Sequence, residues 1–169
     1  MLINIIGFQI GWFACVLGGA NQMAWIGAFI GMAIILRHIK TSFDRESEIK
    51  LISFAMVFGF FFDLIPLSLS WIEFADVSYW PNQLPPPWMT VLWGLFATTL
   101  NISLRWLKNQ YLLSTFIGGI SGPIAYWSGS KLGALSLTNF DAAILFLGIG
   151  WAIAVPFLVK FNARNQSSS

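Results

Sequence analysis

The chain has 169 residues, of which 57% are hydrophobic and 9% are charged. A soluble domain carries roughly 25% charged residues, so the composition excludes a water-soluble domain and indicates an integral membrane protein. The formal net charge of +2 is too small to indicate a nucleic-acid partner.

The residues that would support catalysis of a familiar kind are missing from the sequence. His38 is the one histidine and lies in a charged stretch, so it cannot assemble a metal set with Cys15, the one cysteine. The sequence also contains no GxSxG elbow and no P-loop. We therefore expect no metal and no cofactor, and we favour a protein that is not an enzyme.

Apolar runs follow one another along the whole chain. A helix that rises 1.5 Å per residue needs about 20 residues to cross roughly 30 Å of hydrocarbon. The pattern predicts an all-α bundle of about six transmembrane helices in one domain over residues 1–160, and residues 161–169 as a disordered cytoplasmic tail. The predicted spans cover residues 2–17, 23–36, 51–71, 88–105, 112–128 and 142–159.

The basic residues give this bundle a direction. Lysine and arginine stay in short cytoplasmic loops far more readily than they are translocated. Lys131 follows the fifth span and would lie outside, whereas the basic residues after spans two, four and six would lie inside. We therefore expect both termini in the cytoplasm. The inside set comprises Arg37, Lys40, Arg45, Lys50, Arg105, Lys108, Lys160 and Arg164.

Asp63 lies near the middle of the third span, where an ionisable group costs roughly 2.5 to 3.5 kcal/mol on insertion scales. We expect it to face the bundle interior, within hydrogen-bonding reach of Thr98 and Asn101 in span four. Arg105 and Lys108 would continue that polar stripe to the cytoplasmic end. Asp63 is either structural polar glue or a group that handles protons, ions or a ligand, and the sequence leaves both open.

Span five places small residues on one face together with Tyr126, which we include in the candidate polar site. Small residues four apart let helix backbones approach closely. Gly7 with Gly11 and Gly27 with Gly31 repeat the pattern in spans one and two. Such faces serve packing inside the bundle, and they also leave a homo-oligomer open. The small residues of span five are Gly118, Gly122, Gly129 and Gly133.

Three stretches, FQIGWFACVLGG, PPWMTVLWGLFATTLNISLRWL and GGISGPIAYWSGSKLGAL, resemble the small bacterial inner-membrane proteins grouped as domain of unknown function 2878. The resemblance implies an all-helical protein of a Gram-negative inner membrane and no established activity. At the position where a histidine would be expected, this chain has Ile102. The matching positions are Gln9, Trp12, Trp93, Asn101, Ser103, Arg105, Trp106, Gly122, Pro123, Tyr126 and Gly129.

The resemblance also implies a lipid-linked role beside a fatty-acid-modifying enzyme of the cyclopropane-synthase type. Our first hypothesis is therefore a non-enzymatic factor that associates with membrane lipid or scaffolds a lipid-modifying partner. The second is a small transporter or proton-coupled carrier that uses Asp63. The third is a membrane-embedded enzyme that uses Asp63, Tyr126 and Lys131, which requires these groups to lie within a few ångströms of one another.

Overall fold

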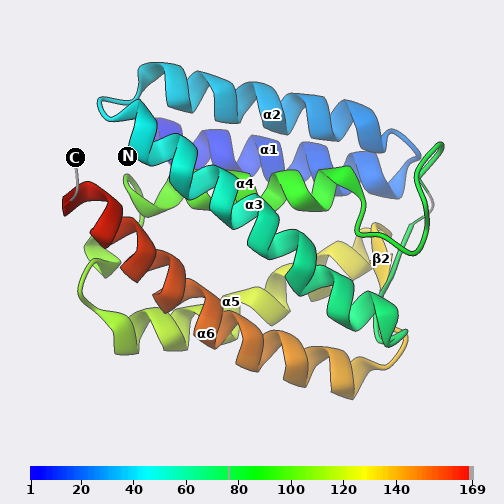
Figure 1. The fold of residues 1–169 in the computed structure, drawn as a ribbon. Coiled ribbons are helices and arrows are strands. Elements are labelled where there is room, and N and C mark those ends of the chain that lie inside the picture. Colours follow the sequence, from blue (N-terminus) through cyan, green and yellow to red (C-terminus); the bar gives the residue numbers. More distant parts are fainter. Residues whose placement is uncertain (76, 168–169) are drawn as a thin grey trace.

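The apolar runs form α-helices in the computed structural model, which describes residues 1–75 and 77–167, the last four by their backbone alone (Figure 1). The helices of the described residues are α1 (Leu2–Ala20), α2 (Ala24–Thr41), α3 (Arg45–Ser68), α4 (Pro87–Leu100), α5 (Tyr111–Lys131) and α6 (Phe140–Ser167), with a 3₁₀ turn η1 (Arg105–Leu107). Strands β1 (Glu73–Phe74) and β2 (Leu135–Ser136) pair antiparallel. The predicted all-α class is confirmed.

Four of these helices are long and apolar enough to cross a membrane: α1, α2, α3 and residues Phe140–Ala163 of α6. Helix α4 has 14 residues, so it is about 21 Å long, which is less than the roughly 30 Å of the hydrocarbon core. Helix α5 has 21 residues, but its glycine and serine residues lower its mean hydropathy, and it is not among these four helices. The chain thus has helices of the length and hydropathy found in membrane proteins. That six of them cross the membrane stays a prediction.

Helix α4 ends at Leu100, earlier than the apolar pattern predicts. The hydroxyl groups of Thr98 and Thr99 donate to the carbonyl oxygens of Leu95 and Phe96 in the preceding turn, and such bonds compete with the helical ladder. The chain then leaves the helix by turns. The register that would align Asn101, Arg105 and Lys108 on one face of span four therefore stops before Asn101.

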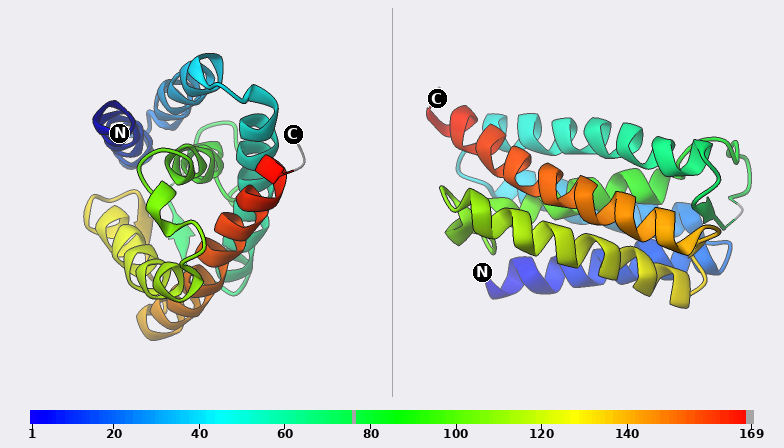
Figure 2. Two further views of the ribbon diagram at one scale, coloured as in Figure 1. Left: turned by 90° about the vertical axis from the view of Figure 1, so that its left-hand side faces the viewer. Right: turned by 90° about the horizontal axis from the view of Figure 1, so that it is seen from below.

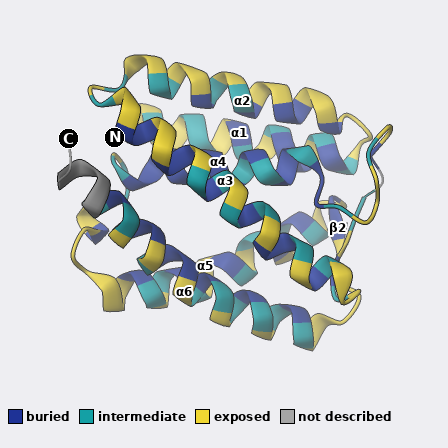
Figure 3. Ribbon diagram, viewed as in Figure 1, coloured by how far each residue is buried: buried dark blue, intermediate teal, exposed yellow. Residues whose placement is uncertain are grey.

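Helix α4 lies at the centre of the bundle and packs against α1, α2 and α3, while α5 packs against α6 and α3 packs against α6. The ribbon coloured by burial shows α4 largely dark and the outward faces of α2 and α6 exposed (Figure 3). Trp88 and Trp93 of α4 are each 1% exposed. A short helix enclosed by longer ones can therefore carry the largest rings of the core.

Both termini lie at one end of the bundle, together with the α2–α3 turn and η1 (Figures 1 and 2). The side chains of Arg37, Lys40, Arg105 and Lys108 belong to that end, whereas Lys131 ends α5 at the opposite end. The basic residues, which are unevenly spaced along the sequence, thus lie mainly at one end of the fold. The predicted tail, 161–169, overlaps α6 up to Ser167, and residues 168–169 lie outside the described residues.

The small-residue faces bring two helix pairs into close contact. A Cβ atom on Gly27 would lie 2.4 Å from the carbonyl oxygen of Ala14, and one on Gly118 would lie 2.3 Å from that of Trp151. These glycines therefore hold α1 against α2 and α5 against α6, as small-residue faces do in membranes.

Replacing Gly118 with Ala is expected to destabilise the protein by about 1–3 kcal/mol, because the new methyl group meets backbone and forces α5 away from α6. The measurement is the thermal unfolding midpoint in detergent. Gly148→Ala is the matched control, since its Cβ would meet no heavy atom closer than 3.7 Å. A Gly118→Ala protein as stable as Gly148→Ala would contradict the close approach of α5 and α6.

Candidate functional site

Asp63 is the centre of a hydrogen-bonded cluster that joins three helices. Its carboxyl group is 1% exposed and accepts a hydrogen bond from the indole nitrogen of Trp93 in α4 at 2.8 Å and another from the hydroxyl of Tyr126 in α5. A buried acceptor in hydrocarbon must find donors inside the protein. Two ring donors meet that requirement, and they tie α3 to α4 and α5.

The aromatic rings around Asp63 occupy space that glycines leave free. The rings of Trp93 and Trp151 stack with centroids 4.4 Å apart. A Cβ on Gly59 would lie 2.0 Å from the Trp93 ring, and one on Gly122 would lie 2.2 Å from the Trp151 ring. Glycine at these two positions thus makes room for indole rings, a role that differs from the backbone approach at Gly118.

The candidate polar residues separate into two places. Tyr126 lies beside Asp63, as the candidate site requires. The Thr98 hydroxyl donates at 2.7 Å to the carbonyl oxygen of Leu95 within its own helix. Asn101 follows the last residue of α4, and its amide donates to the Glu48 carboxyl at 2.8 Å. Asp63 has Trp93 as a partner instead, a residue whose indole N–H sequence reasoning overlooked.

Glu48 organises a second cluster, at the end of the bundle that carries the termini. Its carboxyl group is bonded to His38 of α2 at 3.0 Å and to Asn101. Asn162 of α6 donates in turn to the side-chain oxygen of Asn101 at 2.5 Å. This cluster therefore connects α2, α3, α6 and the end of α4.

The sequence carries a signal for Glu48. Helix α3 begins at Arg45, inside the charged stretch, where Asp44 caps it by accepting from the Ser47 backbone N–H. Residues at spacings of three or four then stay on one buried face. That face runs through Glu48, Ile52, Ala55, Gly59, Asp63 and Pro66, so Glu48 shares the register of Asp63.

The basic candidates lie apart from Asp63. The Lys131 ammonium lies 5.6 Å from the centre of the Trp127 ring and the residue is exposed. Five residues separate Lys131 from Tyr126, which turns it by about 140° around α5. Arg105 and Lys108 line a cavity of about 10 Å³ with Asn101 and Asn162. The geometry does not bring Lys131 together with Asp63 and Tyr126.

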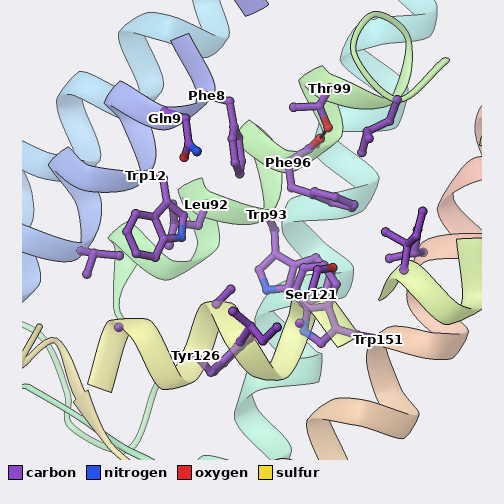
Figure 4. A pocket seen from close by; sticks show the side chains of 18 of the residues that line it. Phe8, Gln9, Trp12, Leu92, Trp93, Phe96, Thr99, Ser121, Tyr126 and Trp151 are labelled. Carbon is purple, nitrogen blue, oxygen red and sulfur yellow. Dashed lines mark hydrogen bonds between the residues drawn. The ribbon is translucent and has the colours of Figure 1, made fainter. Parts of the chain in front are cut away.

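A groove of about 730 Å³ runs between α1, α4 and α5 (Figure 4). Trp93 and Tyr126 line it and bind Asp63 behind them. Figure 4 shows side chains of α1 and α5 on its two sides with rings of α4 between them. The residues that line it from the three helices include Phe8, Gln9, Trp12, Leu92, Trp93, Phe96, Ser121, Ala125 and Tyr126.

The groove has a side mouth between α1 and α5. On its rims Phe13 is 48% exposed, Ile120 is 62% exposed and Ile124 is 54% exposed. At the end near the termini, the Ser103 hydroxyl donates to Asn4 at 2.5 Å, and Asn4 donates to the Thr98 carbonyl at 3.1 Å. These bonds connect α1 to α4 but leave the α1–α5 side open.

The described residues contain no group of three or more His, Cys, Asp or Glu side chains that could hold a metal ion. The side chains that face the groove are mostly aromatic and aliphatic. The arrangement is suited to binding an apolar molecule between helices.

Replacing Asp63 with Ala is expected to lower the free energy of unfolding by about 1–3 kcal/mol, because the indole N–H of Trp93 and the hydroxyl of Tyr126 lose their acceptor. Asp63→Asn should cost less, since the amide oxygen can accept from Trp93 while its NH₂ donates to the Tyr126 oxygen. Thermal unfolding in detergent measures both.

Thr115→Ala is the control for this series, because the partly exposed Thr115 hydroxyl bonds only to the Tyr111 carbonyl oxygen of its own helix among the described hydrogen bonds. It should change the midpoint little. An Asp63→Ala protein that unfolds at the same temperature as Thr115→Ala would show that the cluster does not hold α3, α4 and α5 together.

Comparison with known proteins identifies a family. The family model described as "Protein of unknown function (DUF2878)" matches residues 1–157, which confirms the resemblance. No curated protein and no solved structure matches the chain. Most positions that carry the resemblance line the groove, namely Gln9, Trp12, Trp93, Ser103, Gly122, Tyr126 and Gly129.

Proposed function

The chain belongs to the family described as "Protein of unknown function (DUF2878)", and we propose that it is a lipid-associated protein that holds an apolar chain from the bilayer in its groove. The observation that carries the proposal is the groove of about 730 Å³ between α1, α4 and α5. Ligand pockets in proteins commonly measure roughly 300–1,000 Å³ and are mostly apolar. The groove has that size and that lining.

The shape of the groove favours an elongated occupant. Its lining extends along α1 from Ile5 to Val16 and along α5 from Ile117 to Gly129, which corresponds to about 16–18 Å of helix rise. That length is roughly half of the hydrocarbon thickness. An acyl or isoprenoid chain fits such a space better than a compact solute does.

The mouth of the groove favours a ligand that is already dissolved in the membrane. Its rims are apolar residues on helices that face outward, among them Ile5 at 39% and Ile124 at 54% exposure. In a bundle surrounded by hydrocarbon, a lateral opening of this kind connects the groove with the bilayer. A chain can therefore enter sideways.

The location that we propose is the bacterial inner membrane, with several passes and both termini in the cytoplasm. The end that carries the termini holds Arg37, Lys40, Arg105 and Lys108, whereas Lys131 belongs to the other end. Cytoplasmic ends of membrane helices carry the excess of Lys and Arg. Both observations support this orientation.

The role that we propose is to hold or present a lipid, with a lipid-modifying enzyme as partner, and not to react with it. Tyr126 and Ser103 of the lining already bond to Asp63 and Asn4. A nucleophile needs a neighbouring base within hydrogen-bond reach. Tyr126 has one in Asp63, but Tyr126 is 3% exposed and Asp63 is 1% exposed, so this pair is hardly accessible to a ligand in the groove. The lining therefore offers a ligand apolar contact surface and hydrogen-bonding groups.

Replacing Ala125 with Phe is expected to expel a bound chain, because Ala125 lines the groove and a phenyl ring would fill part of its volume. The measurement is lipid mass spectrometry of protein purified through stringent detergent washing. The wild type should retain about one lipid per chain, and Ala125→Phe should retain several times less.

Ile149→Phe is the matched control, since it adds a ring at a position on α6 that is 56% exposed and does not line the groove. It should keep the lipid. Equal retention by the two variants would contradict the proposal, as would a folded wild type that carries only exchangeable bulk lipid.

A proton-coupled carrier is the second candidate, and the position of Asp63 favours it. Trp93 and Tyr126 both line the groove and both bind this carboxyl group, so an occupant of the groove could affect its donors. Asp63 would then exchange a proton as the groove fills and empties.

In proteoliposomes with a pH-sensitive dye inside, a carrier should move protons down an imposed membrane potential. Asp63→Asn should abolish that flux while its folded yield stays near that of the wild type. Absence of flux in wild-type vesicles, or unchanged flux in Asp63→Asn, would count against the carrier and leave the lipid-binding proposal in place.

A further inference from the structure

Two polar side chains line the groove without a protein partner. Gln9 comes from α1 and Ser121 from α5, and both line the groove (Figure 4). Both are exposed, and neither forms a side-chain hydrogen bond with any described residue. The neighbouring hydroxyls differ: Ser114 and Thr115 at the start of α5 donate to the carbonyl oxygen of Tyr111.

The depth of these two residues makes their lack of partners costly. Gln9 lies about 10 Å of helix rise beyond Leu2, and Ser121 lies about 15 Å beyond Tyr111. Both positions are well inside the length of their helices. An amide or hydroxyl that leaves water without forming a hydrogen bond costs about 1–3 kcal/mol by protein mutational data. An occupant that bonds to them removes this cost.

Both side chains can be satisfied by the same kind of ligand atom. The Gln9 amide and the Ser121 hydroxyl each offer a donor as well as an acceptor. An acceptor oxygen on an occupant therefore satisfies either group.

The rest of the lining restricts the kind of oxygen. Among the described residues that line the groove none is charged, so a phosphate or carboxylate would find no counter-ion there. Several rings surround the two polar groups, including Phe8, Trp12 and Phe96 (Figure 4). An uncharged oxygen on an apolar body matches this environment.

We propose that the groove selects a lipid that carries an uncharged carbonyl or hydroxyl oxygen within its apolar body, which Gln9 and Ser121 bind. This inference rests on the proposed lipid-binding function and adds the ligand class. The ester groups of ordinary phospholipids lie at headgroup level, outside the depth of these residues. Two sources supply the required chemistry: a prenylquinone, and an acyl chain oxidised at a middle carbon.

The test uses wild-type protein in nanodiscs and the tryptophan fluorescence of the groove, quenched by a phospholipid with brominated chains. Methyl 12-oxooctadecanoate and methyl octadecanoate compete as a matched pair, and a short-chain prenylquinone competes against a prenylbenzene without oxygen. The oxygenated member of at least one pair should displace the brominated chain about three- to tenfold better, as expected for one or two net hydrogen bonds.

Gln9→Leu and Ser121→Ala should each reduce this preference several-fold, measured as the ratio of the displacement by the oxygenated member to that by the oxygen-free member. Ser128→Ala is the matched control, because it removes a hydroxyl from α5 at a position that does not line the groove. Preference for the oxo ester alone assigns an oxidised acyl chain, and preference for the quinone alone assigns a prenylquinone.

Equal displacement by both members of each pair in the wild type would overturn the selection while keeping the lipid site. An unchanged preference in the Gln9→Leu, Ser121→Ala double variant would also overturn it. If no competitor displaces the brominated chain, the groove is not a lipid site and the proposed function itself fails. The same holds if Ile124→Cys cross-links two copies of the chain, because a second copy would then cover the mouth of the groove.

Discussion

The carboxyl group of Asp63 imposes the constraint on which the interior of this protein depends. An acid in the middle of a membrane bundle needs donors, and here Trp93 and Tyr126 supply them. Each donor ring belongs to a different helix, so satisfying one carboxyl fixes α4 and α5 relative to α3. The same two rings form the back of the groove. The polar interaction therefore determines where the apolar surface lies.

The Glu48 cluster fastens α3 to α2, to α6 and to the residue after α4, near the other end of α3. Glu48 and Asp63 lie on one face of that helix, about 22 Å apart along its axis. Bonds from Glu48 reach His38 and Asn101, and Asn101 reaches Asn162. The two clusters hold α3 to α2, α4, α5 and α6. Buried carboxyl groups thus act here as specific connectors between helices.

Periodicity and charge predict the helices and the buried position of Asp63, because these follow from one helix at a time. The separation of Asn101 from Asp63 depends on where α4 stops. Helix α4 stops at Leu100, beside two threonines whose hydroxyls bond to their own backbone, and hydropathy does not record that end. The choice of Trp93 as donor depends on the free space above Gly59, which appears only when α3 and α4 are packed.

The side of the bundle between α1 and α5 lacks such connectors along most of its length. Helix α1 packs on α2 and α4, and α5 packs on α6, while the Ser103–Asn4 bond joins α1 to the chain after α4 near the termini. The helices that the two carboxyl clusters fix do not include α1. No described hydrogen bond joins α1 directly to α5, so a separation of these two helices would widen the mouth of the groove.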